Sequence, residues 1–395
     1  MKKKILCLLL GLIVFIVSCT PIKTKTKNDY TKVDYDELRA VWISYYDYDF
    51  TDDNEESAKL KIDTMFDNIS QLNLNTVFLH IRANADSLYK SNLFPYFESI
   101  KNLMAASPEF DILEYMIKCA HKRGIKLHAW FNPYRISNKF ALAEELPDGH
   151  IAKGWFLDGN EDNAVISFGE KLYFNPAVTR VQKLIIDGVR EVVENYDIDG
   201  IHFDDYFYPE CDETFDKVNY EAYCESTTLP LSLTQWRTAN VNALVAAVKN
   251  IAKQSGLPFG ISPSAHIYGD YIEKNGYADI EKWLQSDDYV DYVIPQIYWG
   301  FDYPATEYAY ENILKKWVSL KRNDSVKLYI GLAAYKIGTE DQNNEWIENT
   351  DILKRQILSL RAKNVRGFSL FSYSYLFSTN ENNKKEFENI IPLLN

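Results

Sequence analysis

The sequence predicts a single (β/α)8 barrel of the TIM type with long βα loops, preceded by a short export segment. From residue 38 onward, short apolar runs rich in Val, Ile, Phe and Tyr alternate with longer stretches whose apolar residues recur at every third or fourth position. Eight runs and eight stretches follow one another, which is the count for such a barrel. The alternative, an open doubly wound sheet, lacks the Gly-rich turn expected after its first strand.

The expected strands are short and almost wholly apolar, as strands buried on both faces are. They cover residues 38–44, 76–82, 126–131, 200–206, 259–263, 292–298, 327–334 and 367–372. In a barrel of parallel strands, the carboxyl ends of all the strands meet at one face, where the functional groups lie. The strand ends are therefore where we look for chemistry.

The expected helices are amphipathic stretches between these strands. They cover residues 56–72, 111–123, 177–196, 233–255, 280–285, 306–321, 352–363 and 384–394. The stretch 111–123 is bounded by Gly124, which ends a helix at little cost, and Asn175–Pro176 is a start signal for the stretch that follows it. The remaining long segments, 138–171, 209–234 and 268–279, are predicted as βα loops.

The first residues carry an export signal. Three lysines precede an apolar run at residues 5–17 that is too short to span a membrane as a helix, and Ser18–Cys19 closes the run in a pattern that resembles a bacterial lipobox. We expect a lipoprotein signal at 1–18, lipidation of Cys19, a flexible tether at 19–34 and the barrel at 35–395. The protein is then exported and held on a membrane by its lipid, facing the periplasm or the cell surface. An ordinary secretory signal with an incidental cysteine is the alternative.

The composition of the chain indicates which classes of binding partner to expect. The net charge is −13 at pH 7, so a nucleic-acid partner is not expected. Aromatic residues make up 14% of the chain and gather in strand-end segments, which suits a cleft that stacks on sugar rings. Three cysteines remain after the tether, and the sequence leaves open whether Cys211 and Cys224 pair. We expect no cofactor and no metal.

Polar residues at the strand ends form the candidate site. The fourth strand reads DGIHFDDYFYP, and burying His202 and Asp204 in such an apolar strand is costly unless they are paired or functional. Alternation along the strand places His202, Asp204 and Tyr206 on one face, whereas Asp205 joins them only if the strand has already turned into the loop. The other candidates are Arg82, Asn84, Asp86, His128, Trp130, Asn132, Arg135, Gln296, Tyr298, Trp299 and Tyr335.

Asp204 and Asp205 supply the carboxyl groups that glycoside hydrolysis requires. One carboxyl protonates the leaving oxygen and the other attacks the sugar or activates water. Adjacent carboxylates do not automatically straddle a glycosidic bond, so the second group is alternatively Asp302 or Asp86. Two like charges held close together also raise one pKa, which suits a general acid. The pattern leaves open which residue is the acid and whether the anomeric configuration is retained or inverted.

The segments DGIHFDDYFYP, HKRGIKLHAWFNPYR, GISPSA, PQIYW and GLAAYKIG together resemble the bacterial glycosyl-hydrolase-like family ten, over residues 37–377. The resemblance implies a TIM-like barrel with its catalytic position at Asp204. It also implies substrate-facing roles for Arg82, His128, Asn132, Arg135, Gln296 and Tyr298. Members include lipid-anchored proteins and a divisome-localised hydrolase of glycan strands stripped of stem peptides, which makes peptidoglycan glycan strands, or a related amino-sugar polymer, the expected substrate.

The fourth strand also looks like the strand-four signature of family 18 chitinases. Asp199, Gly200 and Asp204 match it, but His202 replaces an aspartate and Tyr206 stands where the acid glutamate belongs. The resemblance therefore implies related barrels and not a shared mechanism.

We expect a hydrolase in which His202 orients Asp204, Arg82, Asn132 and Arg135 hold polar substituents, and Tyr298, Trp299 and Tyr335 stack on sugar rings. Two alternatives remain. One is a lipoprotein that binds glycans without cleaving them. The other is a metal-dependent hydrolase or deacetylase with His202, Asp204 and His128 as ligands, although no paired-histidine motif is present.

Overall fold

Parallel strands form the centre of the protein. The structure is a computed structural model, and it describes residues 37–377 and 380–394. Ten segments form one sheet in the order β10-β12-β13-β1-β2-β3-β7-β8-β9-β11. They are β1 (Leu38–Ile43), β2 (Thr76–Arg82), β3 (Lys126–Phe131), β7 (Gly200–Phe203), β8 (Phe259–Ile261), β9 (Tyr292–Val293), β10 (Gln296–Ile297), β11 (Lys327–Leu328), β12 (Ile330–Leu332) and β13 (Gly367–Phe371).

The ring of strands is closed. Pro295, which has no N–H to give to a ladder, interrupts the sixth strand, so that β9 pairs with β8 and β11 while β10 pairs with β12. The seventh strand is likewise divided into β11 and β12, and β13 then pairs with both β12 and β1. When β9 and β10 are counted as one strand, and β11 and β12 as another, the ten segments of the described residues are the eight strands of a barrel. The predicted fold class is therefore confirmed.

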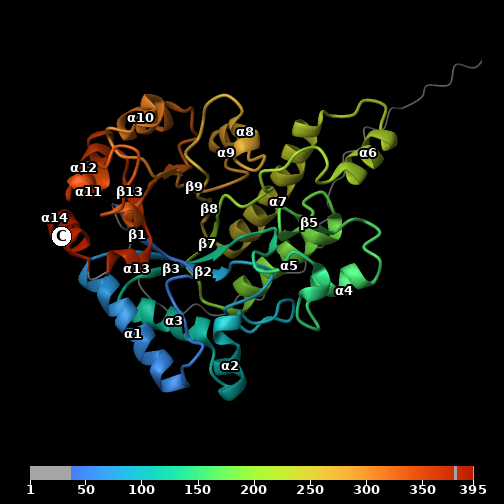
Figure 1. Ribbon diagram of the computed structural model, residues 1–395, viewed down its shortest axis with the longest axis horizontal. Helices are drawn as coiled ribbons and strands as arrows, with labels where there is room; N and C mark the ends of the chain where they lie inside the picture. The colour runs from blue at the N-terminus through green and yellow to red at the C-terminus, as the bar shows by residue number, and fades with distance from the viewer. Residues whose placement is uncertain (1–36, 378–379, 395) are drawn as a thin grey trace, which may run out of the picture.

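Helices surround the ring (Figure 1). Those that follow the strands are α1 (Glu55–Gln71), α3 (Ile112–Lys122), α5 (Thr179–Asn195), α7 (Leu233–Ser255), α9 (Ile280–Gln285), α10 (Tyr310–Ser319), α12 (Ile352–Ala362) and α14 (Glu381–Leu394). Local capping explains why their bounds were readable from the sequence. In α7, the Ser232 hydroxyl accepts from the Gln235 amide at the start, and Gly256 ends the helix at φ 65°.

The predicted loops contain further elements. Residues 135–174 form a small antiparallel sheet of β4 (Arg135–Ser137), β6 (Lys171–Phe174) and β5 (Val165–Phe168), and α4 (Ile151–Leu157) lies between β4 and β5 in the chain. Gly169 and Glu170 both have positive φ, at 55° and 59°, and join β5 to β6 in a two-residue hairpin. The expectation of a plain loop here is therefore wrong. Shorter helices in other connections are α2 (Glu98–Ala106), α6 (Lys217–Ser226), α8 (Tyr271–Lys274), α11 (Glu345–Glu348) and α13 (Tyr373–Leu376).

A layer of aromatic rings fills the interior of the barrel. This layer is separate from the larger hydrophobic core that lies between the strands and the helices. Ala40, Trp42, Phe78, Trp130, Tyr292 and Ile294 form this inner cluster. Two glycines make room for it, because a Cβ on Gly260 would lie 2.1 Å from the Tyr292 ring and one on Gly200 would lie 2.5 Å from the His128 ring. The barrel is thus closed below its carboxyl-terminal face by packed rings.

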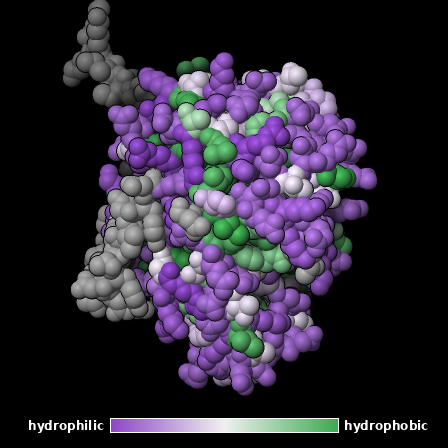
Figure 2. Space-filling view, turned by 90° about the vertical axis from the view of Figure 1, so that its left-hand side faces the viewer, coloured by the Kyte–Doolittle hydropathy of each residue, from purple (hydrophilic) through white to green (hydrophobic). Residues whose placement is uncertain are grey.

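The face shown in Figure 2 is predominantly hydrophilic, and its apolar side chains form a narrow, interrupted band. Within residues 37–377 and 380–394, no helix is both long and apolar enough to cross a membrane. The predicted signal at 1–18, the lipidation of Cys19 and the tether at 19–34 lie outside the described residues. Cys119, Cys211 and Cys224 are free thiols, so the pairing left open for the last two is not formed.

Candidate active site

Asp204 and Asp205 lie together at the mouth of the barrel. Strand β7 ends at Phe203, three residues earlier than predicted, so the strict alternation of a strand no longer applies to the two aspartates that follow. Both line a cavity of about 250 Å³ at the carboxyl ends of the strands. Asp204 is buried, with 6% of its surface exposed, and Asp205 is half-buried.

Gln296 fixes the orientation of Asp204. Its Nε2 donates to Oδ1 of Asp204 at 3.0 Å and to the backbone oxygen of Ser262 at 2.8 Å. The backbone N–H of Asp205 donates to the same Oδ1 at 2.9 Å. Two donors therefore hold one carboxylate oxygen, and the predicted orienting residue, His202, is hydrogen-bonded elsewhere.

The two carboxyl groups share an electrostatic environment. Burial raises the pKa of Asp204, which is offset in part by the hydrogen bonds that it receives from the Asp205 amide and from Gln296. The pKa of Asp205 lies well above its usual range because of burial and the adjacent charge of Asp204. The backbone N–H of Asp205 and the amide of Gln296 stabilise the ionised form of Asp204, whereas the charge of Asp204 favours a protonated Asp205. Asp205 is therefore the group that holds the proton.

Arg135 brings a positive charge to the carboxyl pair. It begins strand β4, and its Nε donates to the backbone oxygen of Ala83 at 3.1 Å. The guanidinium carbon lies 4.7 Å from the ring centre of Tyr206 and 5.9 Å from that of Tyr45. Its charge opposes the rise in the pKa of both aspartates. Of the described residues that line the cavity, Arg135 is the one with a permanent positive charge.

Aromatic side chains form the walls of the cavity. Tyr298 meets Tyr335 edge to face, with ring centres 5.6 Å apart, and is stacked near Phe371 at 6.1 Å. Tyr46 stands at the rim with 74% of its surface exposed. The aromatic lining residues are Trp42, Tyr45, Tyr46, Trp130, Tyr206, Tyr298, Tyr335 and Phe371. Flat apolar rings around a polar pair are the surfaces on which sugar rings stack.

Neutral histidines form the floor below the pair. Trp42 Nε1 donates to Nε2 of His202 at 3.3 Å, and Tyr292 links His128 and His202 through its hydroxyl, at 2.9 Å and 3.3 Å from their Nδ1 atoms. Burial lowers the pKa of His128 to about 4 and that of His202 well below its ordinary value. These residues support the cavity from beneath and carry no charge near neutral pH.

The structure places several predicted site residues away from the cavity lining. Arg82 is buried and donates through Nη2 to the backbone oxygens of Asn132 and Pro133, at 2.8 Å and 2.7 Å, so it anchors the loop that presents Asn132. Asp86 accepts from the Asn84 amide at 3.2 Å, and burial raises its pKa to about 6. Trp299 packs on Tyr308 with ring centres 5.0 Å apart.

Among the predicted residues, those that line the cavity are Trp130, Asn132, Arg135, Asp204, Asp205, Tyr206, Gln296, Tyr298 and Tyr335. Sequence reasoning missed Trp42, Ser44, Tyr45, Tyr46, His80, Ser262 and Phe371, which line it as well. His80 had a readable signal, because it lies between Phe78 and Arg82 on the inward face of an alternating strand. It stacks on Trp130 at 3.7 Å, nearly parallel at 8°.

The three residues considered as metal ligands are not gathered at one point. His128 and His202 turn their Nδ1 atoms to Tyr292, while Asp204 faces Gln296. Within the described part of the chain, no group of three or more His, Cys, Asp or Glu side chains is placed to hold a metal ion. The metal-dependent alternative therefore gains no support from the geometry.

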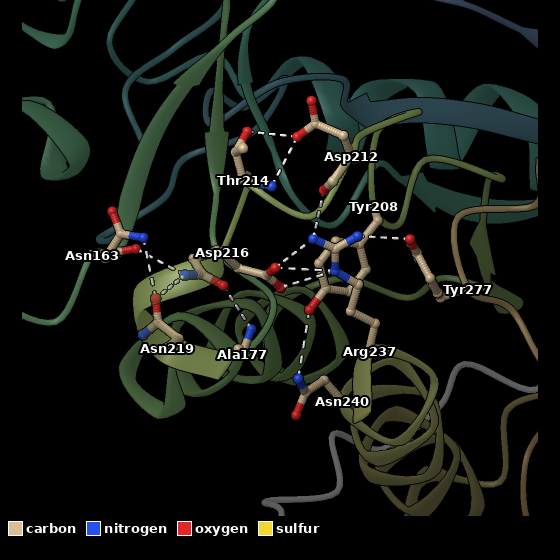
Figure 3. Close-up of polar contacts among 11 residues, drawn as sticks. Asn163, Ala177, Tyr208, Asp212, Thr214, Asp216, Asn219, Arg237, Asn240 and Tyr277 are labelled. Carbon is tan, nitrogen blue, oxygen red and sulfur yellow. Dashed lines mark hydrogen bonds and ion pairs between the residues drawn. The ribbon is translucent and has the colours of Figure 1, made fainter. Parts of the chain in front are cut away.

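A buried ion pair anchors the loop that follows the aspartates (Figure 3). Nη2 of Arg237, on α7, lies 2.6 Å from Oδ1 of Asp216, and the two side chains are 1% and 0% exposed. The guanidinium also donates to the hydroxyl of Tyr277 at 2.7 Å and to the backbone oxygen of Asp212 at 2.8 Å. This cluster, centred on Arg237, fixes the segment from Tyr208 to α6 against the outer helices.

Among solved structures, the fold is similar to a glycoside hydrolase domain and to the catalytic domain of an amylase. The glycoside hydrolase domain of PgaB (BpsB) from Bordetella bronchiseptica is 13% identical, with a TM-score of 0.60 over 91% of this chain and 99% of that one. The catalytic domain of β-amylase from Paenibacillus polymyxa is 11% identical, with a TM-score of 0.56 over 90% and 98%. At such identities the likeness shows the fold alone.

Sequence relatives give the family. The glycosyl hydrolase YngK of Bacillus subtilis is 31% identical over 94% of this chain and 74% of its own length. The glycosyl hydrolase DigH of Escherichia coli K12 is 31% identical over 78% of this chain and 74% of its own. The family model described as glycosyl hydrolase-like 10 matches residues 37–348. By these matches, and as the motifs at the strand ends predicted, the chain belongs to the glycosyl hydrolase-like 10 family.

Proposed function

We propose that this protein is a glycoside hydrolase that cleaves a bacterial glycan, with peptidoglycan glycan strands or a related amino-sugar polymer as its substrate. The observation that carries the proposal is the pair of adjacent aspartates, the buried Asp204 and the half-buried Asp205, in a cavity walled by aromatic rings. Breaking a glycosidic bond requires an acid for the leaving oxygen and a negative charge near the developing oxocarbenium ion.

Asp205 is the general acid in this proposal. Its raised pKa keeps it protonated where an ordinary aspartate is ionised, which is the property that protonation of a leaving oxygen needs. Asp204 remains the charged partner, because Gln296 and a backbone N–H stabilise its ionised form.

The cavity walls supply substrate binding. Tyr298 and Tyr335 offer faces for sugar rings, and Arg135 and Asn132 offer N–H donors to hydroxyl, amide or carboxylate oxygens. Relatives whose names state glycosyl hydrolysis support a glycan in this role, and the resemblance to a divisome hydrolase supports the cell wall as its source.

We further propose export and a lipid anchor at Cys19, supported by the apolar run and the Ser18–Cys19 junction. Expression with a radiolabelled fatty acid tests this. Wild type takes up label and Cys19→Ala does not if the anchor is correct, whereas equal labelling of both contradicts it.

The decisive experiment incubates the purified full-length protein with sacculi whose stem peptides an amidase has removed, followed by mass spectrometry of the soluble products. Wild type and Asp287→Asn, an exposed aspartate beyond the opposite end of the barrel, should release oligosaccharides. Asp204→Asn and Asp205→Asn should not. Release that is equal in all four proteins assigns the activity to a contaminant. Binding without release by wild type establishes the glycan-binding alternative instead.

A further inference from the structure

Both carboxyl groups of the pair come from adjacent residues at one strand end, which differs from the layout of a two-carboxylate mechanism. A retaining glycosidase separates its two carboxyl groups by about 5–5.5 Å and an inverting one by about 6.5–9.5 Å, so that the sugar or a water fits between them. Here the two carboxyl groups belong to adjacent residues that line one cavity, and the Asp205 amide donates to Oδ1 of Asp204 at 2.9 Å. The two groups therefore address the same side of a bound sugar.

No third carboxylate faces this pair among the described residues that line the cavity. Asp302, one sequence-based alternative, is exposed outside the lining, and its backbone N–H donates to Glu345. Asp86, the other, is bonded to the Asn84 amide behind Arg135. Asp47, which follows the first strand, accepts hydrogen bonds from the Ser44 amide at 2.6 Å and from the Ser372 hydroxyl at 2.8 Å, so both of its oxygens already have partners.

We infer that the substrate supplies the nucleophile, and that the sugar cleaved carries a 2-acetamido group whose carbonyl oxygen attacks C1. This inference rests on the proposed glycosidase function and narrows its substrate class to N-acetylated amino-sugar glycans. Substrate-assisted hydrolysis is an exception to the two-carboxylate scheme, because the substrate replaces the enzyme's nucleophile. What the enzyme then supplies is one acid and one neighbouring carboxylate that orients the acetamido group. Asp205 and Asp204 fill these two places.

The chemistry balances without any further reagent. In the first step the acetamido oxygen forms a bond to C1, the bond from C1 to the leaving oxygen breaks, and Asp205 gives its proton to that oxygen. In the second step water attacks C1, Asp205 takes a proton from the water, and the bond between C1 and the acetamido oxygen breaks. The net reaction is hydrolysis with retained configuration at C1.

Asp204 and Tyr298 are the residues that position the acetamido group. The carboxylate of Asp204 accepts the acetamido N–H, which turns the carbonyl oxygen toward C1, and Gln296 keeps that carboxylate from rotating. Tyr298 lines the same cavity as the pair, and burial and the charges of both aspartates raise its pKa, so its hydroxyl stays a neutral donor. Such a donor is suited to the acetamido oxygen.

The first test uses a chitobiose-derived thiazoline, which mimics the bicyclic oxazoline formed in the first step. Calorimetry with the purified full-length protein measures its binding, and an assay on stripped glycan strands measures inhibition. We expect competitive inhibition, with binding that is weakened in Asp204→Asn and unchanged in Asp287→Asn. Cleavage that proceeds while the thiazoline neither binds nor inhibits would overturn the inference.

The second test compares glycan oligosaccharides that differ only in their N-acyl groups. Fluorine withdraws electrons from the carbonyl oxygen, so the rate should fall with each step from acetyl to trifluoroacetyl. Equal rates across the series, or cleavage of a glycan without acetamido groups, leave a glycosidase but reject the substrate as nucleophile. Failure to cleave or bind any of these glycans rejects the proposed function itself, so the two failures are distinguishable.

Discussion

The side-chain amide of Gln296, on strand β10, donates to Oδ1 of Asp204, which follows strand β7, at 3.0 Å. A residue of the sixth barrel strand thus sets the orientation of a carboxylate from the fourth. The same amide is held by the backbone oxygen of Ser262, from the strand between them, so the whole arrangement depends on three strands keeping their register.

Gln296→Ala should lower kcat about ten- to a hundredfold, because a hydrogen bond to a charged group contributes about 1.5–3 kcal/mol. Loss of this bond also raises the pKa of Asp204, which must be ionised, so the acidic limb of the rate profile moves to higher pH. Rates from pH 4 to pH 9 check both effects. A fall in rate with an unmoved acidic limb would show that Gln296 contacts the substrate instead of positioning Asp204.

Asp205→Asn should reduce kcat/KM on glycan strands about 10²–10⁴-fold, the usual contribution of a general acid. Wild type should lose activity as pH rises through the raised pKa of Asp205 and as it falls through that of Asp204, which gives a bell-shaped profile of two coupled values. In the variant the basic limb should vanish. Aryl glycosides with acidic leaving groups should be spared, and an equal loss on both substrates would argue against an acid role.

Asp216→Ala should lower the free energy of unfolding by about 3–5 kcal/mol, because Arg237 would remain buried without its partner. Asp162→Ala is the matched control, since the Asp162–Arg180 pair is largely exposed, with side chains 42% and 38% accessible. That change should cost about 0–1 kcal/mol. Urea unfolding measures both variants, and similar small losses would mean that the cluster around Arg237 is not a stability element.

Gly260→Ala should destabilise the barrel by about 1–3 kcal/mol or more, because the added Cβ would lie 2.1 Å from the rigid Tyr292 ring. Gly154→Ala, inside α4 with nothing within 4 Å of its Cβ, should be neutral or stabilising by about 0.5–1 kcal/mol. Thermal unfolding of the two variants gives the contrast. An unaffected Gly260→Ala protein would show that the inner layer of rings is loosely packed.

Stability should fall on acidification between about pH 6.5 and the depressed pKa of the buried histidines, which is about 4 for His128. In that window the imidazole of His128 is protonated in the unfolded chain and neutral in the folded protein. Its contribution to the free energy of unfolding is therefore fully present above pH 6.5 and is lost as the pH falls below it. Asp204 and Asp205, whose pKa values are raised, change stability with pH in the opposite direction. The measurement is therefore the urea midpoint of wild type minus that of His128→Gln, followed as a function of pH. Parallel curves for the two proteins would contradict a neutral His128.

Strongly buried strands were predictable from the sequence, and irregular ones were not. The bounds of β2 and β3 match the prediction because their residues are apolar or inward-facing throughout. The sixth strand is divided at Pro295, which lacks an N–H for the strand ladder. Whether that lack breaks the strand depends on which neighbouring strand lies beside Pro295, and only the closed barrel determines this. The β5–β6 hairpin was missed because each strand has four residues and no clear alternation.

The candidate site was predictable where polar residues interrupt apolar strands, as Asp204 and Asp205 do. Trp42 and Phe371 were missed because, in sequence, a ring that lines a cavity looks the same as a ring in the core. Arg82 was expected at the substrate because it ends a strand, but its long side chain reaches back to two carbonyl oxygens. The partnership of Gln296 with Asp204 spans 92 residues and needs the three-dimensional fold.

Arg135 does not belong to the barrel. It opens β4 of the small antiparallel sheet and pairs there with Tyr173 of β6, whereas the aspartates directly follow β7 and Gln296 begins β10. The bond-breaking groups and the cation beside them are therefore encoded in separate structural modules. An exchange of Arg135 would change both the charge presented to a substrate and the pKa of the two aspartates, while the barrel strands keep their sequence. The accessory sheet therefore tunes the protonation of two side chains that belong to another part of the fold.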